Sequence, residues 1–138
     1  MYTVQKVSSS TALTLIIHAI DEATKINKPI AIAVSGPEGE LISFLRMDGA
    51  SPAAAVIAQN KAYTSARDRK DTREMGIFMR EMERPPAYWG DSGITGFGGG
   101  AAIVRDGKAI GGIGISGLSE EEDERIAKAA IAKAYPAL

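Results

Sequence analysis

Two short turn sequences constrain the fold of this chain more than any other feature: Gly36-Pro37-Glu38-Gly39 and Asp106-Gly107. Each turn separates two runs of β-prone residues: 30–35, 40–46, 101–105 and 108–115. Connections this short can join only antiparallel strands, because a parallel crossover needs about a dozen residues or more. We therefore predict two β-hairpins.

Helical patterns occupy much of the remaining chain. Ser8-Ser9-Ser10 offers N-caps to a helix that reaches about Asn27, and an apolar face is expected at its helically spaced large residues: Leu13, Ile16, Ile17 and Ile20. Three further helices are predicted over 52–69, 72–83 and 120–134, and Ser119 with Glu122 forms a capping box for the last one. Hairpins and helices in this order predict an α+β fold in the broad α/β class, with helices packed on one antiparallel sheet in a single domain, 1–138.

Composition excludes several classes of protein. The chain has 138 residues and a net charge of -1, and its basic residues alternate with acids over 67–74, so no nucleic-acid partner is expected. No apolar run approaches the roughly 20 residues of a membrane span, so we expect no membrane partner and a cytoplasmic protein. Without cysteine, and with a single histidine, the chain is expected to hold no structural metal. Any metal should arrive inside a cofactor.

A glycine-rich block over 93–126 is the predicted ligand region. Gly98, Gly99 and Gly100 allow a sharp bend and let a flat or anionic molecule approach backbone N–H groups. Residues 112–117 also match the G-x-G-x-x-G dinucleotide pattern. We interpret that match as false, because its first two glycines fall inside a predicted strand rather than at the start of a helix.

A second candidate site combines the end of the first hairpin with the next helix. Arg46 and Asp48 follow the hairpin, and Lys61 and Thr64 share one side of the helix. Together these side chains could hold a carboxylate. Alternatively, Lys61 and Asp48 could form an exposed ion pair that contributes only about 0 to 1 kcal/mol. The sequence leaves both interpretations open.

His18 is the only imidazole, and a helical wheel at 100° per residue places it about 160° from the expected apolar face. It could be a solvated or subunit-facing side chain, or an axial ligand to haem iron. The acidic run Glu120-Glu121-Glu122-Asp123 falls in a first helical turn, where it is expected to stabilise the macrodipole.

Three blocks of the chain, 34–50 (VSGPEGELISFLRMDGA), 60–66 (NKAYTSA) and 97–130, resemble the HbpS-like, or GlcG-like, family of haem-binding proteins. This family also includes the C-terminal domain of PduO-type cobalamin adenosyltransferases. Its hallmarks are a hairpin ending in R-x-D-G, a helix with K-A-x-T-A, a G-G-x-P segment, and G-x-I-G-V-S-G before an acidic helix. The chain departs from this pattern at Ala101-Ala102 and at Ser65-Ala66.

The resemblance implies a profilin-like fold, assembly into a homodimer or a higher even oligomer such as a tetramer or octamer, and haem or corrinoid binding in some members. By similarity, nine residues map onto the ligand-binding blocks: Arg46, Asp48, Lys61, Thr64, Gly98, Gly99, Gly100, Ser116 and Gly117. His18 is carried only as a candidate iron ligand.

We therefore expect a non-catalytic protein that binds a small ligand, haem or a related tetrapyrrole, and is accessory to a small-molecule catabolic pathway. One alternative is a small enzyme for a hydroxy acid or aldehyde, in which Lys61 and Arg46 hold the carboxylate and Asp48 is the acid or base. The sequence shows no activated nucleophile for such an enzyme. The other alternative is a structural oligomeric subunit without chemistry.

Overall fold

The computed structural model describes residues 1–135. The elements in chain order are α1 (Ser9–Lys25), β1 (Ala31–Ser35), β2 (Leu41–Arg46), α2 (Pro52–Asp68), α3 (Thr72–Glu81), the 3-10 helix η1 (Pro86–Trp89), β3 (Gly100–Arg105), β4 (Lys108–Ser116) and α4 (Glu120–Ala134). Among the described helices, none is both long and apolar enough to cross a membrane. The predicted order of helices and strands is confirmed, and η1 is an addition within a stretch expected to be irregular.

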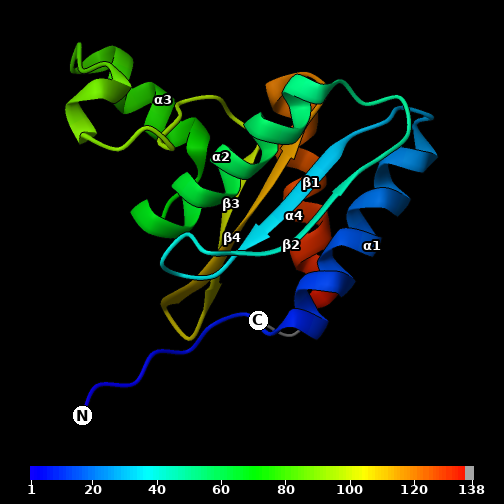
Figure 1. Cartoon of the computed structure of the whole chain (residues 1–138), viewed down its shortest axis with the longest axis horizontal. Helices are drawn as coiled ribbons and strands as arrows, with labels where there is room; N and C mark the ends of the chain where they lie inside the picture. Colours follow the sequence, from blue (N-terminus) through cyan, green and yellow to red (C-terminus); the bar gives the residue numbers. More distant parts are fainter. Residues whose placement is uncertain (136–138) are drawn as a thin grey trace.

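The four strands form one antiparallel sheet in the order β2-β1-β4-β3 (Figure 1). Both predicted hairpins are present, and β1 pairs with β4 to join them side by side. In this register Ala31 lies between Arg46 on one neighbouring strand and Ser116 on the other. The α+β fold predicted from the two turns is confirmed.

Helices cover both faces of the sheet (Figure 1). On one face, alternate residues of β1 such as Ile32 and Val34 join a large core with α1 and α4. On the other face, Ala31 and Ala33 contact a row of alanines on α2: Ala54, Ala58 and Ala62. Alanine pairs leave little space between helix and sheet, so α2 lies close to the strands. This close approach is what buries the polar side chains of α2 at the candidate site.

The segment from α3 to η1 extends beyond the sheet at the upper left of Figure 1. A small separate cluster of Met75, Met79 and Ile94 anchors it, with Tyr63 and Trp89 packed around the cluster. The segment therefore has its own limited apolar core.

The buried side of α1 differs from the predicted one. Leu13 and Ile17 were expected to be buried, but they are 55% and 50% exposed. The apolar residues that are buried form a different stripe with several small members: Ala12, Leu15, Ile16, Ala19 and Ala23. Small side chains let α1 approach α4 closely, so the helix is rotated relative to the face that its largest apolar residues suggest.

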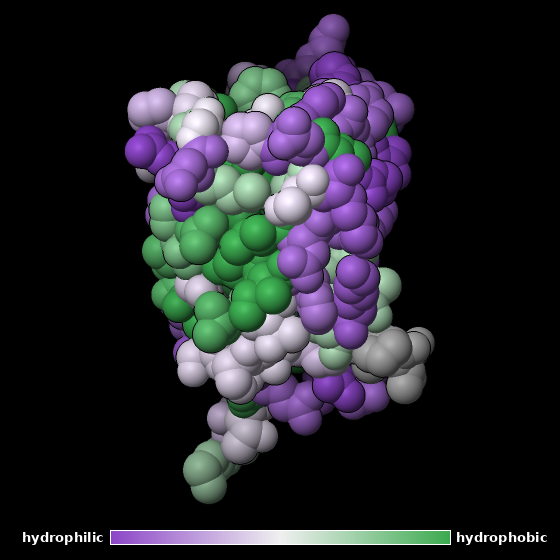
Figure 2. All heavy atoms as spheres, turned by 90° about the vertical axis from the view of Figure 1, so that its right-hand side faces the viewer, coloured by the Kyte–Doolittle hydropathy of each residue, from purple (hydrophilic) through white to green (hydrophobic). Residues whose placement is uncertain are grey.

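This rotation leaves apolar side chains on the outside of the molecule. Leu45 of β2 is 37% exposed and lies opposite Ile32, so it points to the same side of the sheet as α1. Figure 2 shows apolar side chains gathered on the face that carries α1. We call the surface formed by Leu13, Ile17 and Leu45 the α1–β2 patch.

Candidate functional site

Several of the predicted ligand residues lie at one end of the sheet. Arg46 ends β2, Ser116 ends β4, and both pair with Ala31 in one row. Gly100 begins β3 at the same end, where it pairs with Gly114. The antiparallel register brings these residues together from strands far apart in the sequence.

Lys61 lies beneath this end of the sheet with its side chain 3% exposed. Its ammonium donates to the carbonyl of Ile115 at 2.8 Å and to Oδ2 of Asp123 at 3.1 Å. Oδ1 of Asp123 accepts the backbone N–H of Leu118 at 3.2 Å. Burial raises the pKa of Asp123, while the Lys61 ammonium acts in the opposite direction. Lys61 therefore has internal partners on two elements.

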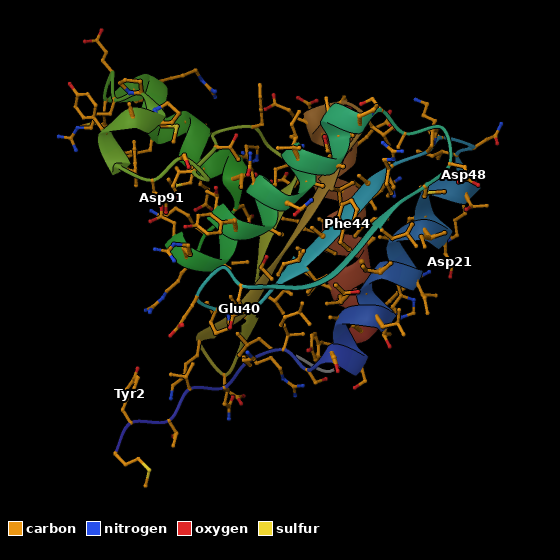
Figure 3. All side chains as sticks on the ribbon, viewed as in Figure 1. Tyr2, Asp21, Glu40, Phe44, Asp48 and Asp91 are labelled. Atoms are coloured by element: carbon orange, nitrogen blue, oxygen red, sulfur yellow. The ribbon has the colours of Figure 1, made fainter. Side chains whose placement is uncertain are left out.

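The suggested Lys61–Asp48 ion pair is wrong, because the partner of Lys61 is Asp123. Asp48 is exposed in the turn after β2, and Figure 3 shows it on the opposite side of the molecule from Asp91. Arg46 is also exposed. The structure thus does not bring the ammonium of Lys61 together with Arg46 and Asp48 around one carboxylate.

Asp123 was missed as a site residue because its acidic neighbours indicate a macrodipole role for the whole run. Helical spacing could have found it: Asp123 lies three and four residues before Ile126 and Ala127, which are buried. One member of this acidic turn therefore lies on the buried face of α4.

The glycine cluster contacts the buried ion pair directly. Gly99 has φ +123°, and a Cβ there would lie 2.7 Å from Nζ of Lys61 and 2.7 Å from Cβ of Asp123. The N–H groups on either side already have acceptors: Gly98 donates to Oε1 of Glu120 at 2.7 Å, and Gly100 donates to Oγ1 of Thr72 at 2.8 Å. Glycine at 99 allows the backbone to close over the ion pair.

Thr64 has a comparable internal role. Its buried hydroxyl donates to the carbonyl of Gly93 at 3.2 Å and accepts the N–H of Thr95 at 3.0 Å. These bonds hold the segment that leads from η1 into the glycine cluster. Gly117 follows Ser116 with φ +132°, where its chain turns beside Pro29.

A cavity of about 360 Å³ opens beside the glycine cluster, between α3 and residues 95–97. Met79, Pro86 and Phe97 supply apolar walls, and Arg80 supplies a cation. Glu120, which accepts from Gly98, also borders this space. The cavity therefore combines apolar walls with one cation and one carboxylate.

His18 lies elsewhere, halfway along α1 and half-buried at the margin of its buried stripe. Because α1 and α2 cover opposite faces of the sheet, His18 is on the face opposite Lys61 and Thr64. The predicted iron ligand and the predicted glycine-lined site are therefore two separate places.

The chain is similar to one protein family and to several known relatives. A family described as haem degrading protein HbpS-like matches residues 7–132. Protein GlcG of Escherichia coli K12 is 36% identical over 109 residues, which are 79% of this chain and 80% of that protein. The corrinoid adenosyltransferase PduO of Salmonella typhimurium LT2 is 34% identical over 120 residues, but the match covers only 34% of PduO.

Solved structures with a similar fold include a complex with heme and a variant of HbpS. A complex of PduOC with heme has a TM-score of 0.84 and 29% identity, covering 92% of this chain and 94% of that one. A variant of Streptomyces reticuli HbpS has a TM-score of 0.89 and 25% identity, covering 96% of this chain and 90% of that one.

Proposed function

The chain belongs to the HbpS-like family, and from that membership we propose that it binds haem. The observation that carries the proposal is the similarity to PduOC in complex with heme, at 29% identity over 92% of this chain. We also propose that the protein is an accessory binding protein of a small-molecule catabolic pathway. A cobalamin-type corrinoid is the other ligand to test.

The donor set of this chain fits haem better than a bare metal ion. Among residues 1–135 no group of three or more His, Cys, Asp or Glu side chains is placed to hold a metal. Haem brings four porphyrin nitrogens of its own, so a single axial imidazole suffices. We propose His18 as that ligand, supported by its half-exposed position outside the core of α1. Bound haem would supply an iron centre with redox and ligand-binding chemistry.

The remaining predicted ligand residues fall into an exposed group and a buried group. Arg46 and Asp48 are exposed and could meet a charged group of a ligand directly. Lys61 and Thr64 are buried and have internal partners, so we propose that they shape the sheet end with the glycines and Ser116. The cavity beside Phe97 and Arg80 is the second place that could receive the tetrapyrrole ring.

The test is an absorbance titration of the purified protein with hemin, in parallel with hydroxocobalamin. We expect a shifted Soret band that saturates at a fixed ratio to protein and that weakens at least tenfold in His18→Ala. Thr14→Ala is the matched control, because Thr14 is exposed one turn earlier on the same helix. A spectrum that stays like free hemin would contradict haem binding.

The variants also locate the ring. If Arg80→Ala and Phe97→Ala weaken saturable binding while His18→Ala does not, the ring lies in the cavity beside α3 and His18 is not the ligand. Saturation by hydroxocobalamin alone would assign a corrinoid instead of haem.

We further propose that the protein forms an even homo-oligomer through the α1–β2 patch. β2 is an edge strand with one side unpaired, and the exposed Leu13, Ile17 and Leu45 lie along the same face. Antiparallel pairing of two β2 strands about a two-fold axis would bring the exposed apolar side chains of both copies together. Burying the apolar side chains would supply the driving force.

A further inference from the structure

A cavity that contains none of the predicted ligand residues lies on the α2 side of the sheet. It has a volume of about 310 Å³ and is bounded by the end of β1, the β1–β2 turn, α2 and residues 91–93. In Figure 3 it lies between the segments that carry the labelled Asp91 and Glu40. It is therefore separate from both the glycine cluster and His18.

Tyr63 of α2 forms one wall of this cavity and is held by contacts from several segments. Its ring lies between Gly39 and Gly93, where a Cβ at either position would come within 2.7 Å of a ring carbon. The guanidinium of Arg67 lies 4.9 Å from the ring centre. The phenol donates to Oδ2 of Asp91 at 2.8 Å, which raises the pKa of Tyr63 and keeps it protonated. These contacts hold the Tyr63 ring in place from within the chain.

The one charged side chain that lines the cavity, Asp91, is already compensated within residues 1–135. Besides the Tyr63 phenol, it accepts the N–H of Gly93 at 3.1 Å and faces Nε of Arg67 at 3.4 Å. A cationic ligand would have to compete with Arg67, and an anionic ligand would meet the carboxylate. The cavity thus favours a neutral molecule.

Hydrogen-bonding groups in the cavity remain available. Ser35 is 2% exposed, and its hydroxyl makes no hydrogen bond to any of residues 1–135. Among residues 1–135, every fully enclosed side-chain oxygen has a hydrogen-bond partner. Because the Ser35 hydroxyl has no partner, it must reach the open space of the cavity.

Two amides of α2 add to this set. Asn60 is half-buried and likewise makes no side-chain hydrogen bond within the described chain. Gln59 uses its Nε2 for the carbonyl of Ala55 at 3.1 Å, which leaves its Oε1 as an acceptor. Hydroxyl and amide groups that converge on a concave space and lack internal partners are typical of a ligand site.

We propose that this cavity binds a small neutral polyhydroxy compound, of the size of a polyol or a monosaccharide. Ser35 and Asn60 donate and accept the hydrogen bonds that select hydroxyl groups, Gln59 accepts a further one, and the Tyr63 ring packs against the carbon skeleton. The site does not depend on haem binding, so either can fail without the other.

The test follows the side-chain amide resonances of Asn60 and Gln59 by NMR during titration with glycerol, xylitol and glucose. Glycerate, xylonate and gluconate are the charged probes, because each keeps the number of carbons of its neutral counterpart and has one terminal carbon oxidised to a carboxylate. We expect saturable shifts at the cavity residues with at least one neutral compound and none with its charged analogue. Absence of saturation with all three neutral compounds, or equal binding of the charged analogues, would overturn the proposal.

Variants separate a specific site from general polyol effects. Ser35→Ala and Asn60→Ala should each weaken binding about fivefold, the equivalent of one hydrogen bond. Ser43→Ala is the matched control, since Ser43 is a strand serine that does not line the cavity. Unfolding midpoints confirm that each variant is folded, and hemin titration of the same variants should be unchanged. Wild-type affinity in both Ser35→Ala and Asn60→Ala would refute the site.

Discussion

The ammonium of Lys61 joins three elements at one point: α2, which carries it, β4 through the carbonyl of Ile115, and α4 through Asp123. With side chains 3% and 2% exposed, neither charge can be left alone. Removing one partner of such a buried pair typically costs about 3 to 5 kcal/mol, because the other charge stays unsolvated. The conformation of Gly99 is part of the same arrangement, since only a residue without Cβ fits over the pair.

At this scale we predict that Gly99→Ala lowers the free energy of unfolding by about 3 kcal/mol, from the positive φ and from the contact with Lys61 and Asp123. Gly107→Ala is the matched control: its φ is +74°, but nothing lies within 4 Å of a Cβ there. It should cost only about 1 kcal/mol. Urea unfolding measures both, and equal losses would show that the ion pair can move away from a new methyl group.

At the scale of elements, α1 is fastened to α4 by one buried carboxylate. Glu22 is 8% exposed and accepts hydrogen bonds from Lys25 at 2.6 Å, Arg125 at 3.1 Å and Lys133 at 3.5 Å. The hydrogen bond from Lys25 is the largest cause that lowers the pKa of Glu22 from 4.5 to about 2, with Arg125 adding to it and burial opposing it. Arg125 and Lys133 belong to α4, so the charge of Glu22 links the two helices.

The folded state lowers this pKa, so the stabilisation by Glu22 is fully present above pH 4.5 and is lost as pH falls toward about 2. We predict that Glu22→Gln lowers the free energy of unfolding at neutral pH by about 2 kcal/mol. The difference between wild type and variant should shrink between pH 4.5 and about 2. Asp21→Asn, at the exposed neighbouring residue, is the control for general charge effects. A difference that stays constant over this range would exclude Glu22 as the titrating group.

At the scale of the whole molecule, the distribution of apolar surface is uneven. Among residues 1–135, small residues are buried between α1 and α4. Leu13 and Ile17 are exposed beside the open edge of the sheet. Isolated exposed leucines are ordinary, but apolar side chains gathered along an unpaired edge strand are typical of protein–protein interfaces, which is why we propose this surface for self-association. The hydrophilic region beside them in Figure 2 marks the limit of that surface.

We predict that Ile17→Glu weakens self-association at least tenfold, because the interface would have to bury a charge. Since Ile17 is 50% exposed, the unfolding midpoint should change little. Val56→Lys is the control, at a residue of α2 that is 59% exposed and outside the patch. Sedimentation velocity at matched concentrations measures the effect. A monomeric wild type, or an unchanged oligomer in Ile17→Glu, would remove this surface from consideration.

The sequence by itself determined the local features: the two hairpins, the helix ends at Ser8 and Ser119, and the misleading nature of the G-x-G-x-x-G match, whose glycines at 112 and 114 lie inside β4. These depend on turn chemistry, caps and spacing within a few residues, which the chain shows directly. The family of the chain was also recognisable from the three sequence blocks 34–50, 60–66 and 97–130, taken in order.

Only the tertiary structure decided which residues meet. The pairing of Lys61 with Asp123 rather than Asp48, and the rotation of α1 toward its alanines, depend on how close the helices approach the sheet and one another. The separation of His18 from the glycine cluster follows from which face each helix covers. The cavity lined by Ser35 and Asn60 is formed by four segments that lie apart in the sequence, so no single motif indicates it. Such contacts are long-range packing outcomes, and periodicity along one helix or strand carries no information about its partner.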